Sequence, residues 1–147
     1  MPNELYGDAT RLKQVLINLI KNALKFTRNG KIKIFFAFDA EKSKLVVKVV
    51  DTGKGFAKQE GANLFKMFGK LKGTAALNVD GIGLGLMICK QLVEFNGGQI
   101  SMTSEGQDMG ATVSFTFRAT TEDSEQDELE TQKDIDMLCD KSQTTDI

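Results

Sequence analysis

The sequence of 147 residues contains no histidine. This absence excludes Ser-His and Cys-His catalysis on this chain, together with zinc sites that use histidine ligands. It also means that the chain cannot itself carry a phosphohistidine. Cysteine is scarce: Cys89 falls in an apolar helical pattern and Cys139 in an acidic segment. We therefore expect a reducing compartment and no disulfide framework, with Cys89 as a buried structural thiol.

Long apolar runs are missing too. No stretch approaches the ~20 residues that a membrane helix needs. The start of the sequence lacks the basic region and apolar run of a secretion signal. With 41% apolar and 27% charged residues, the composition is that of an ordinary globular protein. We therefore expect a soluble cytoplasmic domain without membrane contact of its own, whose parent protein can be anchored elsewhere.

Charge divides the chain into two parts. Residues 120–147 contain ten acidic residues and two lysines, a net charge of −8. Residues 1–119 contain ten acidic residues and seventeen lysines and arginines, a net charge of +7. We expect one basic domain over residues 1–119, suited to a polyanionic ligand, and an acidic tail over residues 120–147. The tail is either disordered or a docking segment for a basic partner.

Apolar periodicity predicts the order of the structural elements. Residues 9–26 and 84–96 have the spacing of amphipathic helices, and Asp8 is a suitable N-cap for the first. Strands are predicted where Ile, Val and Phe are concentrated, at residues 31–38, 44–51, 99–104 and 111–119. This order predicts an α/β (α+β) two-layer sandwich with adjacent antiparallel strand pairs rather than a parallel βαβ sheet.

A polar stripe runs along the first predicted helix. At about 100° per residue, five side chains fall within roughly 80° at the edge of the buried face, namely Arg11, Gln14, Asn18, Asn22 and Lys25. The stripe is either a solvated face or the lining of a cleft. In a cleft, asparagine oxygens suit Mg²⁺ and a lysine suits phosphate.

Two glycine-rich segments are further candidates. Asp51-Thr52-Gly53-Lys54-Gly55 ends a predicted strand with a carboxylate, which could accept a hydrogen bond from an exocyclic amine such as that of adenine. Gly81-Ile82-Gly83-Leu84-Gly85 opens the second helix, where backbone amides can bind phosphate. Each segment alone could equally be a turn. Neither is a dinucleotide fingerprint or a P-loop, because no βαβ unit and no Gly-Lys-Ser/Thr accompany them.

Taken together and in this order, the motifs resemble the ATP-binding domain of sensor histidine kinases, within the GHKL or Bergerat-fold ATPases. Residues 8–27 resemble the N box of that family, residues 51–56 the G1 box, residues 64–68 the F box and residues 81–86 the G2 box. The likeness covers about residues 5–118. It implies the Bergerat ATP-binding fold, a mixed and mostly antiparallel sheet packed on helices, with a flexible ATP lid near residues 69–80.

The resemblance also implies a role for individual residues. Asn22 would hold Mg²⁺, Asp51 would accept from the adenine amine, and Thr112 would support the Asp51 end of the pocket. One lid lysine would contact the γ-phosphate, and Lys66, Lys70 and Lys72 are all candidates. The full set implied to bind ATP is Asn18, Asn22, Lys25, Phe26, Asp51, Gly53, Gly55, Lys70, Gly81, Gly83, Leu84, Gly85 and Thr112.

The implied function is that of the catalytic domain of a two-component histidine kinase, which positions Mg·ATP for transfer of the γ-phosphoryl group. The acceptor histidine would lie on dimerisation helices that this chain lacks, and a response regulator would act downstream. One alternative is a clamp ATPase of the same superfamily, but such enzymes use a glutamate on the first helix, and residues 10–26 contain no acid. Another is a regulatory nucleotide-binding module without transfer. We expect no nucleic-acid partner, because an interleaved aromatic and basic platform is missing.

Overall fold

The computed structural model of the protein describes residues 1–65 and 84–121. Helix α1 spans Ala9–Phe26 and helix α2 spans Gly85–Phe95. The strands are β1 (Ile32–Asp39), β2 (Lys44–Asp51), β3 (Ile100–Thr103) and β4 (Ala111–Arg118). The predicted lid and nearly all of the acidic tail lie outside the described residues.

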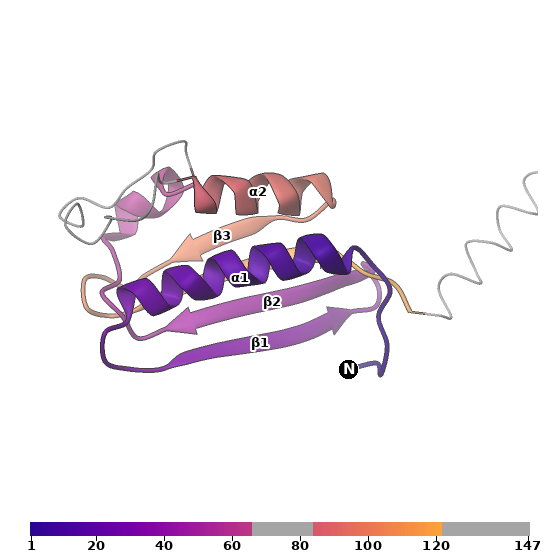
Figure 1. Ribbon diagram of the computed structural model, residues 1–147, viewed down its shortest axis with the longest axis horizontal. Coiled ribbons are helices and arrows are strands. Elements are labelled where there is room, and N and C mark those ends of the chain that lie inside the picture. Colours follow the sequence, from indigo (N-terminus) through magenta and orange to yellow (C-terminus); the bar gives the residue numbers. More distant parts are fainter. Residues whose placement is uncertain (66–83, 122–147) are drawn as a thin grey trace, which may run out of the picture.

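The four strands form one sheet in the order β1-β2-β4-β3, and every neighbouring pair is antiparallel. Both helices lie on the same face of this sheet (Figure 1). The predicted two-layer sandwich is therefore confirmed. A further antiparallel bridge joins Tyr6 to Thr120, so that the chain enters α1 beside the end of β4.

Local signals explain where the first helix begins and ends. The Asp8 carboxylate accepts a hydrogen bond from the Arg11 backbone N–H at 2.9 Å, which satisfies one of the free donors of the first turn. The helix ends at Phe26, before the turn that contains Gly30. These features fix α1 with the bounds that the apolar period predicts, 9–26.

The core lies between the helices and the sheet. Alternate residues of β2 and β4 face the helices, because successive side chains of a strand point to opposite faces. The fully buried side chains of this core are Val15, Leu19, Val47, Val49, Cys89, Val93, Phe115 and Phe117. Burial of this apolar surface holds the two layers together.

A short 3₁₀ helix, η1, spans Lys58–Asn63, and the apolar pattern of the sequence does not predict it. Its six residues are too few to show a helical period. Lys58 pairs with Glu105 in the connection between β3 and β4, with Nζ 2.8 Å from Oε2. The segment after β2 is thereby tied to the β3–β4 hairpin.

Candidate nucleotide-binding site

The carboxylate of Asp51 lies at the end of β2, on the sheet face that the helices cover. The residue is only 8% exposed. Its Oδ1 accepts a hydrogen bond from the Gly53 N–H at 2.8 Å. Within the described part of the chain, Oδ2 accepts no hydrogen bond. A buried carboxylate with one oxygen held and one open is suited to recognise a donor on a ligand.

The turn after β2 is bonded to the end of α1. The Lys54 N–H donates to the Phe26 carbonyl at 3.0 Å. A Cβ on Gly53 would overlap that same carbonyl oxygen, so a glycine is needed for the two segments to approach. The last turn of α1 and the turn that carries Asp51 are therefore held in fixed contact.

The same turn also rests on the β3–β4 hairpin. Gly110 N–H donates to the Gly53 carbonyl at 3.0 Å. Gly55 has φ +58°, and a Cβ there would overlap the Gly106 carbonyl. The buried Ser104 hydroxyl accepts from the Phe56 N–H at 3.1 Å and lies 2.7 Å from the Gly110 carbonyl. Gly53 and Gly55 thus have a structural reason to be glycine within the protein itself.

Three of the predicted site residues, Lys25, Phe26 and Gly53, line one cavity of about 390 Å³. The other lining residues were not predicted from the sequence, namely Arg28, Asn29, Thr52, Lys54 and Asp108. The chain after α1 and the turn after β2 supply most of this lining.

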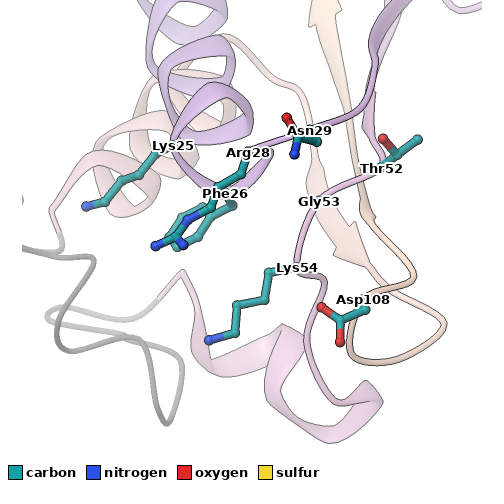
Figure 2. Close-up of a pocket in the computed structure, with 8 residues that line it drawn as sticks. All are labelled: Lys25, Phe26, Arg28, Asn29, Thr52, Gly53, Lys54 and Asp108. Atoms are coloured by element: carbon teal, nitrogen blue, oxygen red, sulfur yellow. The ribbon is translucent and has the colours of Figure 1, made fainter.

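The cavity carries three cationic side chains. Lys25, Arg28 and Lys54 extend toward the same side, and the Asp108 carboxylate lies at the opposite side (Figure 2). Lys25 Nζ lies 5.7 Å from the centre of the Phe26 ring. This arrangement suits a ligand with a flat apolar part and several negative charges.

The two asparagines predicted on α1 are half-buried. The thiol of Cys89 on α2 donates a hydrogen bond to the Val15 carbonyl of α1 at 3.9 Å, which contributes to the contact between the helices. Burial raises the pKa of that thiol to about 11, and the Asn18 side chain lowers the pKa in part. Asn22 lies one turn beyond Asn18 along α1 and is not among the residues that line the cavity.

The strand register does not bring Thr112 to Asp51. Asp51 is directly opposite Ala111, and Thr112 is opposite Val50. Because opposite residues in an antiparallel pair share a face, the Thr112 side chain lies on the face away from Asp51. The expected support of Asp51 by Thr112 therefore disagrees with the register, and Ala111 occupies the facing position.

The second glycine segment is described only in part. Leu84 immediately precedes α2, and Gly85 is its first residue. Among the described residues, no atom lies within 4 Å of where a Cβ on Gly85 would stand, apart from its neighbours and the helix backbone. Lys70, Gly81 and Gly83 lie outside the described residues.

The fold and the site together define an ATP-binding domain, in which helices cover one face of an antiparallel sheet and the pocket lies at one end. Residues 7–121 match the family described as "Histidine kinase-, DNA gyrase B-, and HSP90-like ATPase". The chain belongs to this family.

Among curated proteins, the sensor histidine kinase GacS of Pseudomonas protegens is 37% identical over 128 residues, which cover 84% of this chain and 14% of GacS. The hybrid signal transduction histidine kinase L of Dictyostelium discoideum is 44% identical over 110 residues, which cover 71% of this chain and 6% of that protein. The chain thus spans a small part of the length of these relatives.

Solved structures are similar as well. The nucleotide-free catalytic domain of the histidine kinase ThkA superposes with a TM-score of 0.63 at 34% identity, over 78% of this chain and 70% of that one. Full-length ShkA in complex with AMPPNP gives a TM-score of 0.64 at 32% identity, over 76% of this chain and 22% of that one. The chain therefore has the fold of a histidine kinase catalytic domain.

Proposed function

We propose that this domain binds Mg·ATP and presents its γ-phosphate to a histidine on a separate pair of helices. The observation that carries the proposal is the geometry around Asp51. A buried carboxylate, with one oxygen that accepts no hydrogen bond from the described residues, lies at the end of β2, and the turn that follows contributes to a cavity with three cations. The likeness to ShkA, a protein solved with AMPPNP, supports a nucleotide of the same kind here.

Each part of the site would bind one part of the nucleotide. Asp51 Oδ2 would accept a hydrogen bond from the exocyclic amine of adenine. Lys25, Arg28 and Lys54 would offset the charge of the phosphates. Leu84 and Gly85 open α2, whose first backbone N–H groups would donate to a phosphate.

Magnesium would enter with the nucleotide. Among the residues that the structure describes, no group of three or more acidic, cysteine or histidine side chains could hold a metal ion. Mg²⁺ commonly takes one or two protein ligands and completes its shell with phosphate oxygens and water. The half-buried Asn22 amide, about one turn of α1 before Lys25 and Phe26, suits such a single ligand, and the metal would neutralise phosphate charge during transfer.

The domain itself would position the nucleotide and would not form a bond to the transferred phosphoryl group. In the transfer, the bond between the γ-phosphorus and the bridging oxygen breaks, a bond to a histidine nitrogen forms, and ADP leaves. Orientation and charge stabilisation supply most of the catalysis in such reactions. Helix α1 contains no acidic residue that could activate water, and this composition favours transfer over the hydrolysis of clamp ATPases. We place the acceptor histidine on the dimerisation helices of the parent kinase and a response regulator after it.

A reconstituted transfer assay tests the proposal. The domain is mixed with a purified helix pair that bears the acceptor histidine and with γ-labelled ATP. We expect an acid-labile label on the helix pair, lost with Asp51→Asn and retained with Asp39→Asn, a matched change at the far end of the neighbouring strand. A cognate helix pair that acquires no label would contradict the proposal. ATP hydrolysis by the domain alone, at a rate comparable to that of the transfer, would contradict it as well.

The location of the domain follows from the same proposal. A kinase that consumes ATP works in the cytoplasm, and we infer that compartment for this domain. As a separate finding, none of the helices among the described residues is both long and apolar enough to cross a bilayer.

A further inference from the structure

Strand β1 presents apolar side chains at an edge of the sheet. It lies at one end of the strand order, and β2 is its only partner among the described strands (Figure 1). Ile34, Phe35 and Phe36 are 36%, 51% and 45% exposed. Because successive side chains alternate, these three residues expose apolar surface on both faces of the strand. A long apolar edge of this kind is a template for pairing with another strand.

The backbone of β1 offers a row of open hydrogen-bonding groups. The Thr52 N–H donates to the Lys31 carbonyl at 3.1 Å, which shows that the backbone of Lys31 faces β2. Residues of an antiparallel pair alternate between facing the partner and facing away. The N–H and C=O groups that point out of the sheet edge are therefore those of Ile32, Ile34, Phe36 and Phe38.

Charge along this edge is complementary to itself when the strand is reversed. Lys31 and Lys33 lie at its start, and Asp39 and Glu41 lie at its end. Two copies placed antiparallel about Phe35 bring Lys31 of one copy opposite Asp39 of the other, at both ends. Asp39 also pairs with Lys42 at 3.3 Å, but the Lys42 side chain is 71% exposed and this surface pair is weak.

The same arrangement matches the backbone alternation. With Phe35 at the centre, Ile34 of one copy lies opposite Phe36 of the other. The backbone N–H and C=O groups that point out of the sheet edge in one copy therefore meet those of the other copy. Phe35 then lies opposite its own copy in a non-hydrogen-bonded pair, where side chains approach most closely. Apolar contacts fill the centre and ion pairs flank it.

We propose that two copies of this chain associate through β1, antiparallel and centred on Phe35, so that the two sheets become continuous. A single edge strand buries little area compared with the roughly 1,200–2,000 Å² of stable complexes. The dimer is therefore weak and forms with rising protein concentration. The Asp51 carboxylate lies on the helix-covered face of β2 rather than at this edge, so the pairing leaves it uncovered in both copies.

Sedimentation velocity on the purified chain tests the association. We expect the weight-average mass to rise from that of the monomer toward that of the dimer as the protein concentration increases. With Phe35→Glu, the same rise should require a protein concentration at least about tenfold higher. Within one chain the introduced carboxylate would face Lys48, an attractive pair, so the variant should fold. Leu24→Glu, a matched change on exposed α1, should behave as wild type. A wild type that stays monomeric, or a Phe35→Glu variant that associates equally, would overturn the proposal.

Two further variants test the register. In a Cys139→Ser background, Phe35→Cys should form a disulfide-linked dimer on mild oxidation, because directly opposite residues lie within disulfide range. Leu24→Cys serves as the control and should not. Lys31→Glu should weaken the dimer, and adding Asp39→Lys should restore it. Equal cross-linking of both cysteine variants, or no rescue by the second charge change, would count against this arrangement.

Discussion

Single glycines set the shape of the turn that follows Asp51. Gly55 combines a φ of +58° with close contact to the carbonyl oxygens of the β3–β4 hairpin. Gly97 has a similar φ of +68° after α2, but a Cβ there would meet no atom of residues 1–65 or 84–121 within 4 Å. The two positions therefore separate the cost of a strained backbone from the cost of a steric overlap.

This difference predicts two sizes of destabilisation. Gly97→Ala should lower the free energy of unfolding by about 1–2 kcal/mol, the cost of a left-handed backbone for an L-residue. Gly55→Ala should cost more, roughly 3 kcal/mol or above, because the hairpin must also move. Urea titration followed by circular dichroism measures both. Equal losses for the two variants would show that the hairpin accommodates the added Cβ.

The buried thiol of Cys89 predicts a pH dependence. Its pKa of about 11, raised by burial from an ordinary 9.0, means that the folded state keeps the proton to higher pH than the unfolded state. Stability from this group is complete below about pH 9 and is lost as the pH rises through 11. A pKa difference of about 2 corresponds to roughly 3 kcal/mol. In urea titrations, Cys89→Ala should therefore lose less free energy of unfolding than wild type between about pH 8 and 11. Parallel plots of this free energy against pH for the two proteins would contradict the raised pKa of Cys89.

The sequence predicted part of the site at this scale. Lys25, Phe26 and Gly53, which the motif positions single out, line the cavity, whereas Asp51 is not among its lining residues. That these four residues bind a nucleotide stays a prediction. The cations at Arg28 and Lys54 were missed. Each lies in a turn without periodicity, and tertiary hydrogen bonds such as that between the Lys54 N–H and the Phe26 carbonyl bring the two segments together.

Helix α1 is the element that joins the site to the core. Its first turn is held by Asp8, whose second oxygen also lies 2.7 Å from the Arg11 guanidinium. Arg11 in turn stacks over Phe95 at the end of α2, 4.4 Å from the ring centre. One carboxylate thus caps one helix and orients a contact with the other.

Substitutions of Asp8 separate capping from charge. Asp8→Ala should destabilise the domain by about 1 kcal/mol or somewhat more, because the cap and the ion pair are both lost. Asp8→Asn keeps a good capping group and removes only a partly exposed ion pair, so it should cost less than ~0.5 kcal/mol. Thermal unfolding of the three proteins compares them. Equal destabilisation by both variants would mean that charge, not capping, matters here.

Element by element, the sequence predicted the fold well. The bounds of α1 agree with its apolar period, and the strands and α2 differ from prediction by about one residue at their ends. The short η1 was missed for lack of a period. The position of Thr112 relative to Asp51 was missed because a strand register is fixed by its partners, and a slip of one residue reverses the face.

For the whole molecule, the central feature is a basic domain with a buried carboxylate at the end of β2 and a cavity, formed in part by the turn that follows, that three cations line. Residues 1–119 carry a net charge of +7, and the cavity concentrates part of it at one end of the sheet. Family membership explains the fold. The proposed function depends on the binding of adenine through Asp51, which we predict.

Calorimetric titration with Mg·ATP tests that claim most directly. The wild-type chain should bind one equivalent of nucleotide, and Asp39→Asn should bind with unchanged affinity. Asp51→Asn should fold normally yet bind at least about tenfold more weakly, because the adenine amine would meet an amide that cannot replace the carboxylate charge. A folded wild type that does not bind, or an Asp51→Asn variant that binds as tightly as wild type, would contradict the account.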